Sequence, residues 1–487
     1  MSSTESLPGP TRVQFFYLFA AALLFHIAGS WSLPLIDRDE PRFAEASREM
    51  LERQDFVVPY FNNEYRFDKP PLTYWLQSSA YRVFGQNEFA ARLPSAFAAA
   101  GVAVILLVWG RRMFDTAAGW RAAIIFTLSL QVVMHAKAAV ADMLMVFFVT
   151  LAAWAGWEMT RDPAKRAPLS VWWWTFFLAL GFGFLAKGPV AWIVIVPVAV
   201  YISLAGGKKS WIWFAVGILV ALAVTAAWGI PALIRTDGEF LKVGIGKHVV
   251  GRSLATMEGH GAKGLLGYVA TLPMYFVTIF LSFAPWSIRL PELIGGWRDL
   301  WKKHETGFLL WNVVLVFGVF TVVKTKLPHY TLPAIPMLAL VVAHQWPVAG
   351  AARFRKLAMG MAAFILILAL IVFPLVRSQF PAQHLARMSR DVLKPAMEFA
   401  SYEFQEPSLV WYFREYVHGF YRKVDPRKAA KFMRKDGPRF YILPTSEIDN
   451  AFPGKGVNPN WKVFRHQGWN VAKGQKIDLT MIVKTED

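Results

Sequence analysis

The chain contains no cysteine among its 487 residues. Disulfide bonds, thiol nucleophiles and cysteine-ligated zinc sites are therefore excluded. Nucleotide-binding glycine loops and the HExxH pattern of zinc proteases are also absent from the sequence. These absences remove several large enzyme classes, but they do not indicate a compartment.

Acidic residues are scarce compared with basic ones. The chain has 33 Asp and Glu against 52 Lys and Arg, which gives a formal net charge of +19. In a soluble protein this excess would suggest a nucleic-acid partner, but no nucleic-acid-binding motif accompanies it. In a membrane protein, basic residues collect in cytoplasmic loops and near lipid headgroups. We therefore expect membrane lipids, and no nucleic acid, as partners.

Long apolar runs recur along the chain, and 55% of its residues are hydrophobic. Runs of about 18 or more apolar residues are long enough to cross a bilayer, and here they predict about eleven transmembrane helices. The first run is too long for the core of a signal peptide and lacks a cleavage site, so it is predicted to be retained. The predicted helices are 13–33, 90–109, 119–137, 139–157, 171–187, 189–205, 211–231, 266–288, 307–324, 330–346 and 357–376.

Every second loop between these helices is short and basic. Such loops are typical of the cytoplasmic side, so the N-terminus is predicted to be cytoplasmic. The segments 34–89 and 232–265, and everything after 376, then lie on the opposite side. The basic residues are Arg111, Arg112, Arg121, Arg161, Lys165, Arg166, Lys208, Lys209, Arg289, Arg298, Lys302, Lys303, Arg353, Arg355 and Lys356.

Residues 377–487 differ in composition from the rest, being polar and mixed in charge. They predict a small α/β domain outside the membrane, separate from a transmembrane domain of residues 1–376. Strand-like runs occur at Ser408–Phe413 and Phe440–Leu443, and a helix is predicted at Lys428–Lys435. In the first domain, loop 34–89 is predicted to carry two amphipathic helices that lie on the membrane surface.

Unusual polar residues gather on the predicted outer side. Polar groups near membrane helices are costly and tend to be functional. Ordinary roles also remain open: Asp39, Glu40 and Asp142 suit helix starts, Lys187 suits snorkelling at a helix end, and Tyr330 suits an aromatic belt. Lys69, His248 and His329 are of types that also occur as plain surface residues.

A carboxylate at a membrane surface can accept the proton of an acceptor hydroxyl. Cations beside it can bind a phosphate and stabilise it as a leaving group. Together these groups favour transfer of a sugar from a lipid phosphate. Transfer of the sugar with inversion at its anomeric carbon requires one base and no covalent intermediate.

The sequence also resembles a known family. Residues 39–50 (DEPRFAEASREM), 68–75 (DKPPLTYW) and 85–93 (GQNEFAARL) are similar to the bacterial aminoarabinose–lipid A transferases. They are also similar to the protein O-mannosyltransferases of the same C-type glycosyltransferase superfamily. The resemblance continues through residues 142–143, 187–189, 324–333 (KTKLPHYTLP) and 407–412 (PSLVWY).

The resemblance implies an undecaprenyl-phosphate sugar donor and a periplasmic active site in the bacterial inner membrane. It implies that Asp39 and Asp142 act near the reacting sugar, with Glu40 beside them and Arg42 orienting Asp39. A divalent ion, such as Zn²⁺, Mg²⁺ or Mn²⁺, is implied at Asp68 and His248. The expected ligands of the donor phosphate are Lys69, Arg252, Tyr330, Lys187 and Lys326.

We therefore predict a monomeric, inverting glycosyltransferase with the C-type fold, whose acceptor is a glycolipid of the lipid A type. Protein O-mannosylation is the alternative within the enzyme class. A transporter or flippase of lipid-linked sugars is a second class, although its polar residues should lie at the membrane midplane. A non-catalytic protein that only binds polyprenyl lipid is a third class.

Overall fold

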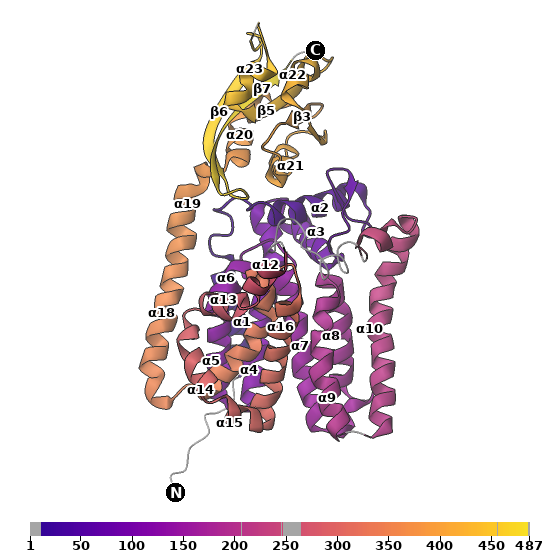
Figure 1. The fold of residues 1–487 in the computed structure, drawn as a ribbon, viewed down its shortest axis with the longest axis vertical. Helices are drawn as coiled ribbons and strands as arrows, with labels where there is room; N and C mark the ends of the chain where they lie inside the picture. Colours follow the sequence, from indigo (N-terminus) through magenta and orange to yellow (C-terminus); the bar gives the residue numbers. More distant parts are fainter. Residues whose placement is uncertain (1–10, 206, 245, 247–263, 455, 486–487) are drawn as a thin grey trace. The chain divides into compact units, whose positions relative to one another are not determined.

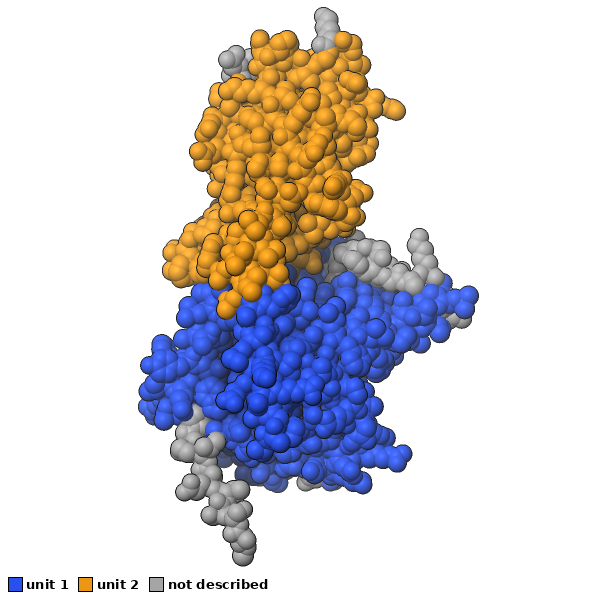
Figure 2. All heavy atoms as spheres, turned by 90° about the vertical axis from the view of Figure 1, so that its left-hand side faces the viewer, with its two compact units in different colours: residues 1–28, 67–76, 92–365 blue, residues 29–66, 77–91, 366–487 orange. Residues whose placement is uncertain are grey.

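The computed structural model describes residues 11–205, 207–244, 246, 264–454 and 456–485. The chain divides into two compact units, which are coloured separately in Figure 2. Unit 1 comprises residues 1–28, 67–76 and 92–365, and unit 2 comprises residues 29–66, 77–91 and 366–487.

Unit 1 is built of helices that run side by side (Figure 1). Its main helices are α1 (Arg12–Ile27), α4 (Glu88–Met113), α5 (Thr116–Leu128), α6 (Leu130–Ala136), α7 (Asp142–Arg161), α8 (Val171–Lys187), α9 (Ile195–Ala205), α10 (Lys208–Arg235), α12 (Gly264–Thr271), α13 (Met274–Ser282), α14 (Leu290–Gly295), α15 (Trp297–Lys302), α16 (His304–Val322), α17 (Ile335–Gln345) and α18 (Ala351–Ile367). Two 3₁₀ helices, η2 (Pro189–Val194) and η5 (Pro328–Ala334), precede α9 and α17.

Five helices of the described residues are long and apolar enough to cross a membrane, and up to seven spans result if two bent pairs are counted. Three shorter apolar helices accompany them. Each apolar run predicted as a helix coincides with one helix or with two or three consecutive helical segments. The prediction of a polytopic α-helical membrane protein is therefore confirmed.

Glycines permit close packing between the helices of unit 1. A Cβ atom added at Gly217 of α10 would lie 2.0 Å from the ring of Phe177 on α8, and one at Gly156 of α7 would lie 2.3 Å from Val198. Small residues at such crossings let backbones approach closely inside a bilayer, where packing replaces the hydrophobic effect. The buried ring of Phe177 thus fills the space that Gly217 leaves.

Some helices of unit 1 are broken, and the breaks have local causes. The bend of 64° between α5 and α6 falls at Ser129, whose hydroxyl donates to the carbonyl of Ile125. Residues 323–327 follow α16, and Pro328 then begins the 3₁₀ helix η5, which leads into α17. Proline and hydroxyl side chains commonly produce such kinks. The break at η5 matters for function because His329 and Tyr330 lie on it.

Unit 2 contains a five-stranded sheet with the strand order β4-β3-β5-β7-β6. Its strands are β3 (Glu398–Ser401), β4 (Tyr421–Lys423), β5 (Arg439–Pro444), β6 (Lys462–Asn470) and β7 (Gln475–Lys484), and its helices include α20 (Pro381–Ser389), α21 (Pro407–Phe413) and α22 (Pro426–Met433). The first three strands pair in parallel, whereas β5, β7 and β6 pair antiparallel. This mixed α/β arrangement agrees with the composition of residues 377–487.

The strand predicted at Ser408–Phe413 is wrong, because this run forms helix α21. Its β-type residues are overridden by the residues that flank them. Pro407 occupies the first turn, where its missing N–H costs nothing. The carboxylate of Asp37 accepts hydrogen bonds from the Ser408 backbone N–H at 2.9 Å and from its hydroxyl at 2.6 Å, and so satisfies the start of the helix.

Much of the loop 34–89 folds with the C-terminal residues rather than with the transmembrane helices. Helix α2 (Asp39–Arg53) packs against α21 within unit 2. Its predicted apolar face is buried, with Phe43, Ala46 and Met50 at most 3% exposed. The opposite side is buried as well, since Glu45 and Glu49 are fully enclosed. The position of this helix at the membrane surface stays a prediction.

Candidate active site

Unit 1 encloses a cavity of about 740 Å³, lined mostly by apolar side chains. Its walls come from the end of α8, from η2, and from α10 and α16. Trp192, Trp228, Leu233, Val319 and Phe320 are among the lining residues. A cavity of this volume and character can hold part of a large apolar ligand.

Cationic and polar groups are among the residues that line this cavity. Lys69, Lys187 and His329 contribute side chains, together with Asp68 and Tyr330. The ammonium of Lys187 lies 6.0 Å from the centre of the Tyr330 ring, which packs 5.0 Å from that of Phe320. Four of the predicted site residues, Asp68, Lys69, Lys187 and Tyr330, are thus brought to one cavity that is otherwise apolar.

Asp142 lies beside this cavity, at the first position of α7, and is 7% exposed. Its carboxylate forms a salt bridge with Lys187, whose side chain is 14% exposed. The ammonium of Lys187 is therefore held by a carboxylate inside the protein, which disfavours the alternative that Lys187 snorkels to the membrane surface. Because an acid buried among apolar residues requires a partner, each residue of this pair explains the other.

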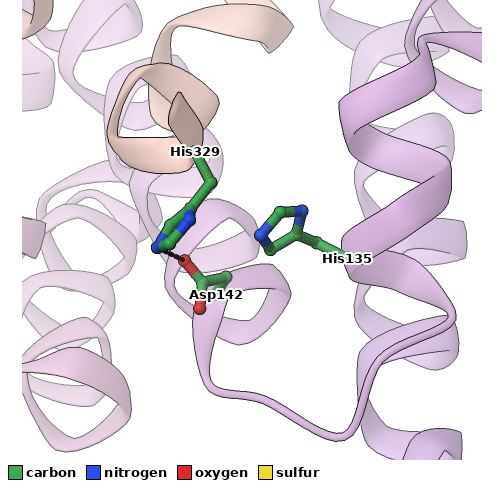
Figure 3. Close-up of side chains that lie close together, drawn as sticks. All are labelled: His135, Asp142 and His329. Atoms are coloured by element: carbon green, nitrogen blue, oxygen red, sulfur yellow. Dashed lines mark ion pairs between the residues drawn. The ribbon is translucent and has the colours of Figure 1, made fainter. Parts of the chain in front are cut away.

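Two histidines complete the surroundings of Asp142, as Figure 3 shows. The Nε2 atom of His329 lies 3.8 Å from Oδ1 of Asp142, and the ring of His329 lies 5.0 Å from that of His135. His135, on α6, did not stand out in the sequence. In one continuous helix, a spacing of seven residues would place His135 and Asp142 on the same face. Residues 137–141 are not helical, so this spacing could not be used to pair them.

Lys326 has a structural role that disfavours its predicted role at the donor phosphate. It is 5% exposed, and its ammonium donates to the backbone carbonyls of Phe320, Thr321 and Val323 at the end of α16. The last carbonyls of a helix lack partners within the helix, and a lysine there satisfies them. Lys326 is also not among the residues that line the cavity.

The acids predicted in the first outer loop belong to unit 2. Asp39 and Glu40 occupy the first turn of α2, as the capping alternative expects. Glu40 is 4% exposed, and its carboxylate accepts a hydrogen bond of 2.8 Å from the backbone N–H of Ile36, so it stabilises a turn. Asp39 is exposed. Of these two acids, Asp39 is the better candidate for contact with a substrate.

Arg42 was predicted to orient Asp39, but no ion pair joins them among the described residues. The positive charge of Arg42 acts instead on Asp37, where it favours the ionised form. Burial is the larger influence on that carboxyl and raises the pKa of Asp37 to about 7. Asp37 was not predicted from the sequence. Its carboxyl caps a helix and also exchanges its proton near neutral pH.

Two further predicted residues, Arg252 and His248, lie outside the described residues. The predicted phosphate contact of Arg252 and the predicted metal pair of Asp68 and His248 therefore remain predictions. Asp68 itself lines the cavity of unit 1.

Comparison with known proteins gives matches to glycosyltransferases. Residues 68–230 match the family described as dolichyl-phosphate-mannose-protein mannosyltransferase. An undecaprenyl phosphate-alpha-4-amino-4-deoxy-L-arabinose arabinosyl transferase of Pectobacterium atrosepticum is 30% identical over 331 residues, which is 67% of this chain and 57% of that protein. A namesake from Pseudomonas fluorescens is 28% identical over 62% of this chain and 54% of that protein. The chain therefore spans little more than half the length of these relatives.

Solved structures share the fold over almost the whole chain. ArnT from Cupriavidus metallidurans, solved with bound undecaprenyl phosphate, superposes with a TM-score of 0.77 at 18% identity and covers 97% of this chain and 98% of its own. The mycobacterial arabinofuranosyltransferase AftD gives a TM-score of 0.53 at 12% identity, over 99% of this chain and 40% of its own. The resemblance predicted from the sequence is thus confirmed: the chain is a multi-pass membrane protein with the C-type glycosyltransferase fold, similar in sequence to the aminoarabinose and protein mannose transferases.

Proposed function

We propose that this protein transfers a sugar from a polyprenyl phosphate, of the undecaprenyl type, to an acceptor with inversion at the anomeric carbon. The observation that supports this most is the cavity of unit 1, whose mostly apolar lining includes several cationic and polar side chains. Its apolar walls match an isoprenoid chain, and its group of cations matches a phosphate. The names of the relatives, which include undecaprenyl phosphate, agree with this ligand.

In the proposed reaction, Lys69 and Lys187 bind the phosphate of the donor, with Tyr330 beside them. Asp142 positions Lys187 through their salt bridge. Because the carboxylate of Asp142 is already paired with this ammonium, Asp142 is less suited to act as a base. The acceptor oxygen attacks the anomeric carbon while the bond from that carbon to the phosphate oxygen breaks. A base takes the acceptor proton, a role that the family resemblance gives to Asp39, and the cations stabilise the departing phosphate.

For the acceptor we propose a glycolipid of the lipid A type, in keeping with the aminoarabinose relatives. Protein O-mannosylation is the second candidate, because residues 68–230 match a protein mannosyltransferase family. The two are distinguished by supplying either a lipid A fraction or a membrane protein fraction as the acceptor.

We further propose that the N-terminus is cytoplasmic and that unit 2 is periplasmic, in the inner membrane of a bacterium. The basic loops support this orientation. Within unit 1, α15, which carries Arg298 and Lys302, lies toward the same end of the helices as α14, which follows Arg289, and α9, which precedes Lys208 and Lys209 (Figure 1).

The test is a transfer assay with the purified full-length protein and radiolabelled polyprenyl-phosphate sugars. Wild-type protein should release polyprenyl phosphate and label the acceptor. Asp39→Asn should abolish transfer while leaving binding of polyprenyl phosphate within about twofold, because it removes only the base. Lys187→Met should weaken binding of polyprenyl phosphate by about ten- to a hundredfold, since hydrogen bonds to charged groups contribute about 1.5–3 kcal/mol.

Asp299→Asn and Lys302→Met are matched controls, because this pair lies on α15 with side chains 83% and 76% exposed. Both should behave as wild type. Retained turnover in Asp39→Asn would remove that residue from the role of base. Tight binding of the lipid without release of polyprenyl phosphate from any donor would indicate a transporter or a lipid-binding protein instead of an enzyme.

A further inference from the structure

Two imidazoles and one carboxylate converge beside the cavity of unit 1 (Figure 3). One ligand atom from each of His135, Asp142 and His329 lies within 4.8 Å of the others. We propose that these three residues bind one divalent transition-metal ion. This site differs from the pair Asp68 and His248, which the family resemblance implies.

The hydrogen bonding of His135 suits a metal ligand. Its Nδ1 atom lies 2.9 Å from the carbonyl oxygen of Gln131, one turn earlier on α6. A carbonyl oxygen only accepts, so Nδ1 carries the proton, and the lone pair of the neutral ring is on Nε2. Metal-binding histidines are commonly held in this way, with the second nitrogen donating to a backbone carbonyl, which fixes the ring orientation.

The three ligands come from separate, ordered elements. His135 lies on α6, Asp142 at the start of α7, and His329 on η5. Bonds of about 2.1 Å from a tetrahedral ion place its ligand atoms about 3.4 Å apart. The donor atoms, now within 4.8 Å of one another, must therefore approach by at most about 1.4 Å, which side-chain rotation supplies. Two imidazoles and one carboxylate favour ions such as Zn²⁺, Co²⁺ or Mn²⁺ over Mg²⁺ and Ca²⁺.

Lys187 is the competitor of this ion, because its ammonium already balances the charge of Asp142. A bound divalent ion takes over that balance and repels the ammonium. The site should therefore bind metal more tightly when the lysine charge is removed. The ion would lie close to Lys187 and His329, both of which line the cavity, and would add positive charge there. This contribution to phosphate binding rests on the proposed function, whereas metal binding does not.

The test measures metal content in the full-length protein purified in detergent. The protein is incubated with Zn²⁺ and desalted, and its zinc content is measured by elemental mass spectrometry. In parallel, Co²⁺ is bound, and its visible absorption spectrum reports the ligands of the ion. Wild type should retain about one equivalent. His135→Ala and His329→Ala should reduce retention at least tenfold, and His304→Ala, at the start of α16, should not. His135→Asn, which keeps a donor for the carbonyl of Gln131 but no imidazole, should lose metal in the same way.

Lys187→Met should bind Zn²⁺ roughly tenfold more tightly than wild type or better, because a like charge has been removed. Asp68→Ala and His248→Ala test the other pair. Undiminished metal content in His135→Asn, or loss only in Asp68→Ala and His248→Ala, would overturn the proposal. Since these readouts need no sugar transfer, a failure here is distinct from a failure of the proposed function.

Discussion

Arg414 holds a group of buried carboxylates in unit 2, and its replacement by methionine should strongly weaken the packing of α2. The guanidinium, 4% exposed, forms ion pairs with Glu45, with Glu52 at 2.6 Å and with Glu49 at 3.7 Å. The side chains of Glu45 and Glu49 are fully buried. Removing one partner of a buried ion pair costs about 3–5 kcal/mol, and here Glu45 would keep only Arg48 at 3.0 Å and Glu49 only Arg53 at 3.4 Å.

The effect should depend on pH. Burial raises the pKa of Glu45 to about 6, in spite of the opposing charges of Arg48 and Arg414. Since this folded-state pKa lies above the unfolded value of 4.5, the contribution of Glu45 to stability is present below about pH 4.5 and is lost as the pH rises to about 6. In Arg414→Met the carboxyl can remain protonated at pH 5, so the loss there should fall to about 1–2 kcal/mol, the value of a hydrogen bond.

Hydrogen exchange followed by mass spectrometry measures this directly for the α2 amides of the full-length protein. After correction for intrinsic exchange, a loss of about 3–5 kcal/mol at pH 8 corresponds to exchange about 150- to 5,000-fold faster. Arg422→Met is the control, because Arg422 is 56% exposed and pairs with the partly exposed Glu398. Adding Glu45→Gln to Arg414→Met should restore part of the protection at pH 8. Equal losses at pH 5 and pH 8 would refute the reasoning.

Three further predictions follow from unit 1 and from the proposed topology. Lys69→Ala should weaken binding of polyprenyl phosphate about tenfold or more in an equilibrium assay, with Lys302→Ala as the unaffected control. Gly217→Ala should cost about 1–3 kcal/mol through its clash with the facing α8 ring, whereas Gly229→Ala on the same helix meets no atom within 4 Å and should be neutral or slightly stabilising in thermal unfolding. Because the chain lacks cysteine, single substitutions report topology cleanly. In intact cells an impermeant maleimide should label Lys473→Cys and not Lys302→Cys, and the opposite pattern would invert the proposed orientation.

The transmembrane part of the fold was predictable because a bilayer forces every backbone polar group to be satisfied within its own segment. A long apolar run therefore specifies a helix almost regardless of its neighbours. The segment 407–413 shows the opposite case. Its residue types favour a strand, but Pro407 and the distant Asp37 together start a helix there. No local sequence pattern predicts a capping carboxylate that lies 371 residues away in the chain.

The candidate site was predictable by residue type and only partly by pairing. Lys69 and Lys187 line the cavity as expected, because a cation among apolar segments is costly and so marks a function. No local pattern separates Lys187, which pairs with Asp142, from Lys326, which donates to the last carbonyls of α16. Both are lysines near a helix end, and the partner that distinguishes them is fixed by tertiary packing. His135 was missed for the same reason.

The division of unit 2 along the chain has a consequence for how the protein is made. Helix α2 is synthesised early, but helix α21 and the adjoining Arg414, which cover and neutralise it, are translated more than 350 residues later. At about 5–20 residues per second, α2 remains without its Arg414 partner for on the order of 20–70 seconds. Throughout synthesis the early half of this unit is therefore an incomplete folding partner, and a chain truncated before α21 leaves it permanently so.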